Sequence, residues 1–267
     1  MSNIDAPMNA EMKDFVSVAE TLADISSEIS RKFFRSEFDI AIKESSSPLV
    51  TQADFAIETE MRKYLAEKLP NHSILGEEYG RNSAESEYLW VIDPIDGTSA
   101  FSCGKPTFVT LIALLKSGKP ILGIINQPIL KERWRGVEGT ATVFNGRVCS
   151  TGEVSKSGII RLGCTSPSMF NAQELEKFNK VKGISTITSF GGDGYLYGLL
   201  ASGFMDIVME TDLKIYDIAS AVPIIKGAGG CITDWKGNDI TLETFKGDAI
   251  ATRNGEVYNI AMRAMAQ

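Results

Sequence analysis

The chain has 267 residues, of which 43% are hydrophobic and 23% are charged, and its formal net charge at pH 7 is −7. These values are typical of a soluble globular protein with one large domain or two small ones. The acidic balance and the absence of long basic runs argue against binding to nucleic acid or to an anionic membrane surface. No apolar run reaches the length of a membrane span, and residues 1–12 lack the basic and apolar regions of a secretion signal. The four cysteines form no CxxC pair, so we expect reduced thiols and a cytoplasmic protein.

The first elements that the pattern predicts are two helices. Apolar residues at steps of three and four between residues 11 and 34 define one face of a long amphipathic helix. A Ser-rich loop, residues 43–54, leads into a second helix that Thr51 could cap and Pro70 would end. Lys43 lies in this loop. It fits an ordinary surface lysine, but a lysine on a flexible loop could also close over a metal site.

A short acidic stretch after a predicted strand carries the strongest functional signal. The apolar run 88–92 predicts a buried strand, and Asp93-Pro-Ile-Asp-Gly-Thr98 follows it directly. The proline disfavours a helical conformation for Asp93, so the carboxylates of Asp93 and Asp96 can converge on one point. Mg²⁺ binds such carboxylates, and the backbone carbonyl of Ile95 could complete the ligand set.

The two residues after this pair predict the start of a helix. The free N–H groups and the positive dipole end of a helix that begins at Gly97 and Thr98 would suit a phosphate. Asp-Pro and Asp-Gly are also ordinary turn dipeptides. Taken alone, this stretch therefore leaves a plain turn and a metal site as alternatives.

The remaining elements divide into two segments. The Gly/Ser/Thr-rich run 150–158 predicts a boundary between an α+β segment, residues 1–150, that carries most of the candidate ligands and an α/β segment, residues 151–267. A hairpin is predicted over 107–129 and a short strand and turn over 138–146. In the second segment we expect strands at 159–164 and 205–209, and helices at 172–181, 192–201, 215–226 and 256–265. Pro223 should kink the 215–226 helix or delay its start.

Three further acidic residues lie at the boundaries of predicted elements, where functional side chains collect. Asp54 begins the second helix, Glu77 follows a short apolar segment, and Asp217 begins the 215–226 helix, where a plain helix cap would also explain it. Together with Asp93 and Asp96, they describe a carboxylate site for several metal ions that transfers a phosphoryl group to water.

The sequence offers no nucleophile for a phosphatase that forms a covalent phosphoenzyme. His72 is the single histidine, it lies in a turn composition, and we expect it to be structural, which excludes His-rich metal clusters and phosphohistidine. None of the four cysteines has an arginine six positions later, and the aspartates are spaced DxxD where an aspartyl-phosphate enzyme would show DxD.

Several motifs resemble those of the inositol monophosphatase family of Mg²⁺-dependent phosphatases. They are Gly76-Glu-Glu78, Asp93-Pro-Ile-Asp-Gly-Thr98, Tyr216-Asp217 with Ala228-Gly-Gly230, and the spacing from Lys43 through Thr51 to Asp54. The resemblance spans nearly the whole chain. It implies a layered α/β/α/β/α sandwich in two subdomains, a homodimer, and hydrolysis of a small phosphorylated metabolite by direct attack of a metal-activated water.

The resemblance also implies which residues hold the metal. Glu77, Asp93 and the Ile95 carbonyl would bind a first Mg²⁺. Asp93, Asp96 and Asp217 would bind a second.

The same resemblance implies roles in catalysis. Thr98, hydrogen-bonded toward Glu77 and Asp54, would orient the attacking water, and the amides of Gly97 and Thr98 would hold the phosphate. Lys43 matches the lysine of the family's mobile loop.

The identity of the substrate depends on a later stretch. Residues 190–217, and Gly104-Lys-Pro-Thr-Phe108, resemble the histidinol-phosphatase branch of the family more than the inositol branch. Histidinol phosphate carries an ammonium and an imidazole, so Asp193 and Glu210 beside the phosphate would suit it. Glu210 also matches a residue that binds inositol hydroxyls in the other branch. Only Asp193 therefore discriminates, and a helix-N-terminal aspartate is its structural alternative.

We predict from these observations a Mg²⁺-dependent histidinol-phosphatase, which would act in histidine biosynthesis. The predicted substrate-binding residues are Asp96, Gly97, Thr98, Asp193, Glu210 and Asp217. An inositol-1-phosphate phosphatase is the alternative, and a catalytically silent metal- or phosphate-binding regulator is a third possibility. Ser99, Gly194 and Ile215 depart from the histidinol-phosphatase pattern.

Overall fold

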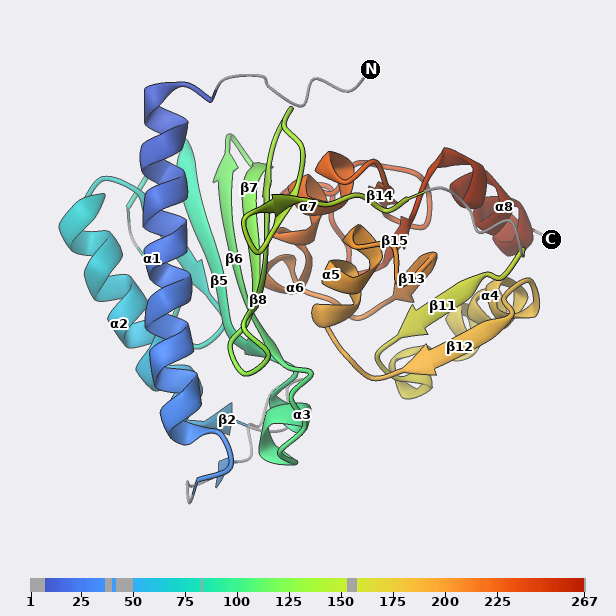
Figure 1. The fold of residues 1–267 in the computed structure, drawn as a ribbon, viewed down its shortest axis with the longest axis horizontal. Helices are drawn as coiled ribbons and strands as arrows, with labels where there is room; N and C mark the ends of the chain where they lie inside the picture. The colour runs from blue at the N-terminus through green and yellow to red at the C-terminus, as the bar shows by residue number, and fades with distance from the viewer. Residues whose placement is uncertain (1–7, 37–39, 42–49, 83, 153–157, 267) are drawn as a thin grey trace.

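The computed structural model describes residues 8–36, 40–41, 50–82, 84–152 and 158–266. Two β-sheets and three layers of helices alternate, so the chain forms the α/β/α/β/α sandwich that the family resemblance implies (Figure 1). A two-stranded ribbon, β1 (Ile40–Ala41) and β2 (Val50–Thr51), lies outside this sandwich. Among the helices that the structure describes, none is both long and apolar enough to cross a membrane.

The first sheet has eight strands and is antiparallel except for one parallel pair, β3 and β5. In spatial order its strands are β10 (Arg147–Val148), β9 (Val143–Phe144), β8 (Glu132–Val137), β7 (Lys119–Gln127), β6 (Val109–Lys116), β5 (Tyr88–Asp96), β3 (Ser73–Gly76) and β4 (Gly80–Arg81). The predicted hairpin is β6 and β7. Strand β8 was not predicted from the sequence, because Glu132-Arg-Trp-Arg-Gly-Val137 carries three charged side chains.

Two helices cover one face of this sheet, α1 (Ala10–Phe33) and α2 (Gln52–Lys68), as predicted (Figure 1). Asn9 caps α1 by accepting the N–H of Met12. The apolar stripe of α1, with Leu22 at its centre, packs with Trp90 and Ile92 of β5 into one buried cluster. This cluster fixes which side chains of β5 face the helices.

The second sheet has five strands and places three parallel strands side by side. In spatial order the strands are β12 (Ile187–Phe190), β11 (Arg161–Cys164), β13 (Ile207–Glu210), β15 (Ala249–Thr252) and β14 (Cys231–Thr233). Helices α4 (Ala172–Gly183) and α8 (Gly255–Ala266) lie on its outer face (Figure 1). Because β11, β12 and β13 are parallel, their carboxyl ends lie at one edge of the sheet.

Between the two sheets lie the short helices α5 (Tyr195–Ala201), α6 (Ile215–Ile218) and α7 (Ala221–Gly227) (Figure 1). The single helix predicted over 215–226 is therefore two helices, which are separated at Ala219 and Ser220. Pro223 lies in the first turn of α7, where an N–H has no partner within the helix, so the predicted alternative of a delayed start is confirmed. The break lets α7 lie directly on the first sheet. A Cβ on Gly123 of β7 would approach the Ser220 carbonyl oxygen to 2.0 Å, so only glycine permits this contact.

One buried cluster spans the central layer and both sheets. It joins Leu111 and Trp134 of the first sheet to Tyr197 of α5, Ile224 of α7 and Val208 of the second sheet. The strands of the first sheet come from residues 73–148 and those of the second from residues 161–252. The division at residue 150 stays a prediction, because this shared core connects the two halves.

His72 has the structural place that the sequence predicts. Its Nδ1 accepts a hydrogen bond from Trp90 Nε1 at 3.1 Å, and its ring stacks on Tyr88. Burial lowers its pKa, which favours the neutral ring that this acceptor role requires. The four cysteines are free thiols.

Candidate metal and phosphate site

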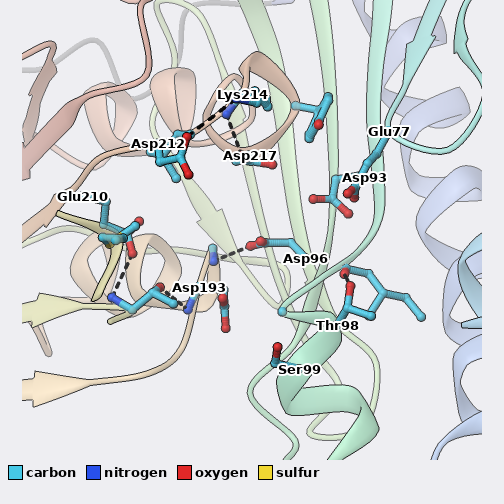
Figure 2. A pocket seen from close by; sticks show the side chains of 17 residues that line it. Glu77, Asp93, Asp96, Thr98, Ser99, Asp193, Glu210, Asp212, Lys214 and Asp217 are labelled. Carbon is cyan, nitrogen blue, oxygen red and sulfur yellow. Dashed lines mark hydrogen bonds and ion pairs between the residues drawn. The ribbon is translucent and has the colours of Figure 1, made fainter. Parts of the chain in front are cut away.

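A pocket lies where strand β5 meets the central helices, and it contains nine of the predicted site residues. Other residues that line it include Ser99, Thr165, Met169, Asp212, Lys214 and Tyr216. The predicted residues among its walls are Glu77, Asp93, Ile95, Asp96, Gly97, Thr98, Asp193, Glu210 and Asp217. Figure 2 shows Glu77, Asp93 and Thr98 on one wall and Asp193, Glu210 and Asp212 on the opposite wall.

Asp93 and Asp96 both face this pocket because strand β5 contains a bulge. Side chains in a strand alternate between the two faces, so residues three apart normally point in opposite directions. The pairing of β5 with β6 shifts register between Asp93 and Asp96, which returns both carboxylates to the face opposite α1 and α2. Ile95, between them, is fully buried in the cluster beneath those helices. The sequence predicted that the strand ends before Asp93. The strand instead continues through Asp96, and the bulge, rather than a turn, brings the carboxylates of Asp93 and Asp96 together.

Asp217 reaches the same point from the other half of the chain. It lies in the first turn of α6, where its Oδ2 accepts the backbone N–H of Lys214 at 2.6 Å. Carboxylate oxygens of Asp93, Asp96 and Asp217, one from each residue, lie within 4.8 Å of one another. Asp217 therefore accepts the N–H of the N-cap residue and also belongs to the acidic cluster, so the alternative of a plain helix cap accounts for only part of its position.

The electrostatics of this cluster favour the binding of a cation. Burial, followed by the charges of Glu77, Asp96, Asp217 and Asp54, raises the pKa of Asp93 well above its usual range. Burial also raises the pKa of Asp217 to about 8. The Asp93 Oδ1 atom is buried and has no hydrogen-bond partner among the residues that the structure describes. A divalent cation would satisfy this atom and offset the repulsion, so the donor set fits a hard metal ion.

The turn after β5 is shaped for close approach. Gly97 has a φ of +90°, and Thr98 begins the short helix α3 (Thr98–Ser102). The Thr98 hydroxyl donates to the Ile95 carbonyl at 3.1 Å. We expected it to bond toward Glu77 and Asp54, and in the described residues it bonds to neither. The short turn from Ile95 to Thr98 makes the carbonyl its nearest acceptor.

Asp193 and Glu210 lie beside this turn at the carboxyl edge of the second sheet. Glu210 ends β13, and its two oxygens accept the Thr165 N–H at 3.0 Å and the Tyr197 hydroxyl at 2.9 Å. Burial raises the pKa of Glu210 to about 7, and these two donors oppose the shift.

Asp193 is held in the left-handed region, with a φ of +46°. Its backbone N–H donates to the Thr165 hydroxyl at 3.0 Å, and that of Gly194 donates to Asp96 Oδ2. A Cβ on Gly97 would approach Asp193 Oδ2 to 2.8 Å, so this carboxylate lies directly against the Gly97 turn. Burial raises the pKa of Asp193 to about 6. Asp193 precedes α5 but points into the pocket, so a plain helix-terminal role does not account for its position.

Of the predicted site residues that the structure describes, one does not line the pocket. Asp54 is buried in the first turn of α2 behind Asp93, whose pKa its charge helps to raise. Lys43 lies outside the described residues. The sequence analysis missed Thr165, which hydrogen-bonds to Glu210 and Asp193, and Tyr197, which hydrogen-bonds to Glu210. Thr165 follows the carboxyl end of a parallel strand, which was an available signal.

Comparisons with known proteins identify the family of this chain. The sequence model of the inositol monophosphatase family matches residues 11–265. The chain is 47% identical to the Arabidopsis thaliana bifunctional phosphatase IMPL2, chloroplastic, over 91% of this chain and 70% of that protein. It is 30% identical to a histidinol-phosphatase of Mycobacterium tuberculosis over 92% of this chain and 95% of that protein.

The structure also resembles solved phosphatases. It superposes with a TM-score of 0.87 on an inositol monophosphatase from Zymomonas mobilis that is 41% identical and covers 97% of this chain and 100% of the other. An inositol monophosphatase from Anabaena, at 25% identity, covers 97% of each chain with a TM-score of 0.83. On these matches, which extend over nearly its whole length, the chain belongs to the inositol monophosphatase family of phosphatases.

Proposed function

We propose that this chain is a Mg²⁺-dependent phosphomonoesterase that hydrolyses histidinol phosphate. One observation carries the proposal of a metal-dependent reaction: Asp93, Asp96 and Asp217 place carboxylate oxygens within 4.8 Å of one another at the base of a pocket. A catalytically silent regulator is disfavoured because none of the carboxylates expected for the metal site is missing from the sequence.

Glu77, Asp93 and the Ile95 carbonyl would hold one Mg²⁺, and Asp93, Asp96 and Asp217 would hold a second. When bound, Mg²⁺ supplies positive charge that polarises the ester, lowers the pKa of water and offsets charge on the leaving oxygen.

The chain's own groups would orient the reactants. The amides of Gly97 and Thr98 would bind the phosphate oxygens. Because the Thr98 hydroxyl already donates to Ile95, its lone pairs are available to accept a hydrogen bond from the attacking water. Glu77 would take up the proton from this water, and Asp54 would support it from behind. Lys43 remains a candidate catalytic residue.

The choice of histidinol phosphate rests on the charge of the opposite wall. Asp193 and Glu210 on this wall are acidic, and Lys214 is the one lysine or arginine among the described residues that line the pocket. A substrate with an ammonium and an imidazole gains from these carboxylates. Histidinol-phosphatases also occur among the relatives of this chain.

Inositol 1-phosphate is the second candidate. The solved Zymomonas protein, at 41% identity, is an inositol monophosphatase, and hydroxyl groups of an inositol could bond to Asp193 and Glu210. The similarity to a phosphatase named bifunctional is compatible with either substrate.

The test is phosphate release by the purified chain with each substrate, in Mg²⁺ and in EDTA. We expect activity only with Mg²⁺ and a kcat/KM at least about a hundredfold higher for histidinol phosphate, which is about 2.7 kcal/mol of transition-state discrimination. A preference for inositol 1-phosphate would overturn the substrate assignment and leave the metal site standing. Hydrolysis that is unaffected by EDTA would overturn the metal site.

The remaining expectations concern assembly and location. A homodimer is testable by light scattering of the purified chain. A cytoplasmic location also remains a prediction, since the Arabidopsis relative is named as chloroplastic.

A further inference from the structure

Glu58 is a buried acid that the proposed reaction does not use. It lies in α2, one turn after Asp54, and its side chain is 0% exposed. An ionised carboxylate in such a place is costly unless charged or hydrogen-bonded partners surround it. Its partners therefore show what this residue holds in place.

Those partners belong to the turn that carries Glu77. Residues 77–79 connect β3 to β4, and Gly80 closes the turn with a φ of +66°. Glu58 Oε2 accepts the backbone N–H of Glu78 at 2.8 Å, and Oε1 accepts that of Tyr79 at 3.2 Å. The N–H of Glu77 itself donates to the Ile92 carbonyl at 3.1 Å. Three consecutive backbone groups are thus fixed, two of them by one carboxylate.

Arg62 completes the arrangement one turn further along α2. Its Nε lies 2.7 Å from Glu58 Oε1, and its Nη2 donates to the Gly80 carbonyl. The guanidinium therefore offsets the charge of Glu58 and also hydrogen-bonds to Gly80, the residue that closes the turn. This fork geometry is available to arginine and not to lysine.

Gly76 makes this approach of Glu58 possible from the other side. A Cβ at Gly76 would lie 2.0 Å from Glu58 Oε1, so any other residue there would displace the carboxylate. The glycine of the Gly76-Glu-Glu78 motif is thus required by the close approach of Glu58, which is a reason distinct from metal binding.

We propose that Glu58, locked by Arg62, is a positioning residue that aims Glu77 at the metal site. Glu77 lies beside Asp93 in the pocket, and its charge contributes to the raised pKa of Asp93 (Figure 2). The turn that bears it is only three residues long, so loss of the two hydrogen bonds to Glu58 frees Glu77 to move away from Asp93. The proposal rests on the proposed function, in which Glu77 is a metal ligand.

The test is the Mg²⁺ affinity of the full chain without substrate, measured by titration calorimetry, for wild type and Glu58→Gln. The glutamine keeps the shape but presents an amide N–H₂ to one of the two backbone donors and leaves Arg62 without its acid. Loss of a residue that orients a ligand typically lowers metal affinity about 10- to 100-fold, and we expect a Kd for Mg²⁺ at least about tenfold higher. Glu60→Gln is the matched control, because Glu60 lies on the same helix and pairs with Lys63 in solvent, and it should leave the Kd unchanged.

A second readout separates positioning from general damage. In Glu58→Gln the Mg²⁺ concentration for half-maximal activity should rise about tenfold. At saturating Mg²⁺ the bound ion would itself hold Glu77 in place, so kcat and KM for the phosphate ester should stay within about threefold of wild type. Should Glu58→Gln fail to fold, Arg62→Lys keeps the charge but loses the bridge to Gly80, and the Kd should rise about threefold or more.

A folded Glu58→Gln chain with wild-type Mg²⁺ affinity would overturn the inference alone. The same holds for Arg62→Lys where it replaces Glu58→Gln. A wild-type chain that binds no Mg²⁺ would overturn the proposed function and the inference with it.

Discussion

Replacing Asp193 by asparagine tests the substrate assignment most directly. Asparagine has the same shape and tolerates the left-handed φ of +46° at this position, so the fold should persist. What disappears is one negative charge against the Gly97 turn. The pKa of Asp193 is raised to about 6, so at pH 8 the wild-type side chain is ionised and the comparison is between a charged and a neutral group.

The magnitude follows from the kind of bond that is lost. A hydrogen bond between a carboxylate and an ammonium contributes about 1.5–3 kcal/mol, so kcat/KM for histidinol phosphate should fall about 10- to 150-fold. A neutral inositol hydroxyl loses at most about 0.5–1.5 kcal/mol, because the asparagine can still accept a hydrogen bond. The ratio of the two kcat/KM values should therefore shift toward inositol 1-phosphate.

The assay is phosphate release at pH 8 and saturating Mg²⁺ for both substrates. Asp212→Asn serves as the comparison variant, since it removes an acid from the exposed rim of the same pocket, where its side chain is 67% exposed and lies 3.7 Å from Lys214. Water screens this charge, so we expect less than about a threefold change. An Asp193→Asn chain whose substrate ratio stays within about twofold of wild type would refute the reasoning, as would an equal shift in Asp212→Asn.

Three further changes have expected outcomes. Asp93→Asn should lower kcat about a thousandfold or more, because it removes a carboxylate common to both proposed metal sites. The same change should raise the Tm in EDTA at pH 8, because it relieves repulsion in the acidic cluster. Near-wild-type phosphate release would contradict the proposed role of Asp93. Gly97→Ala places a Cβ on a residue with a φ of +90°, 2.8 Å from Asp193 Oδ2. This strain costs about 1–2 kcal/mol or more, so scanning calorimetry should show a Tm about 2–8 °C lower. An unchanged Tm would mean that the turn relaxes freely. Glu210→Gln removes a group whose pKa burial raises from 4.5 to about 7, so folded wild type binds the extra proton and loses stability as pH rises through that interval. In urea unfolding with EDTA, the variant should therefore gain up to about 3 kcal/mol relative to wild type between pH 5 and pH 8, and parallel pH profiles would refute the shift.

The sequence alone determined the local structure of the longer helices and of strands β5, β6, β7, β11 and β13, and it indicated the chemistry of the site. The three- and four-residue spacing of apolar side chains placed α1 within one residue of each end, because a helix buries one face wherever that periodicity exists. Asp93, Asp96 and Gly97 could be recognised as a candidate site because their types and order constrain the backbone and favour hard cations. The charge-rich strand β8 was missed, since its side chains alternate poorly between apolar and polar.

Only the tertiary structure decided how these residues meet. Asp217 and Asp193 lie about a hundred residues after Asp93 and Asp96, and no local rule states that α6 and the carboxyl edge of the second sheet lie against β5. The bulge that turns Asp93 and Asp96 to one face depends on pairing with β6, and the break before α7 depends on how closely that helix packs on Gly123. No sequence pattern marks Glu58. The backbone N–H groups that it accepts lie about twenty residues away in the sequence, and only the packing of α2 brings them to it.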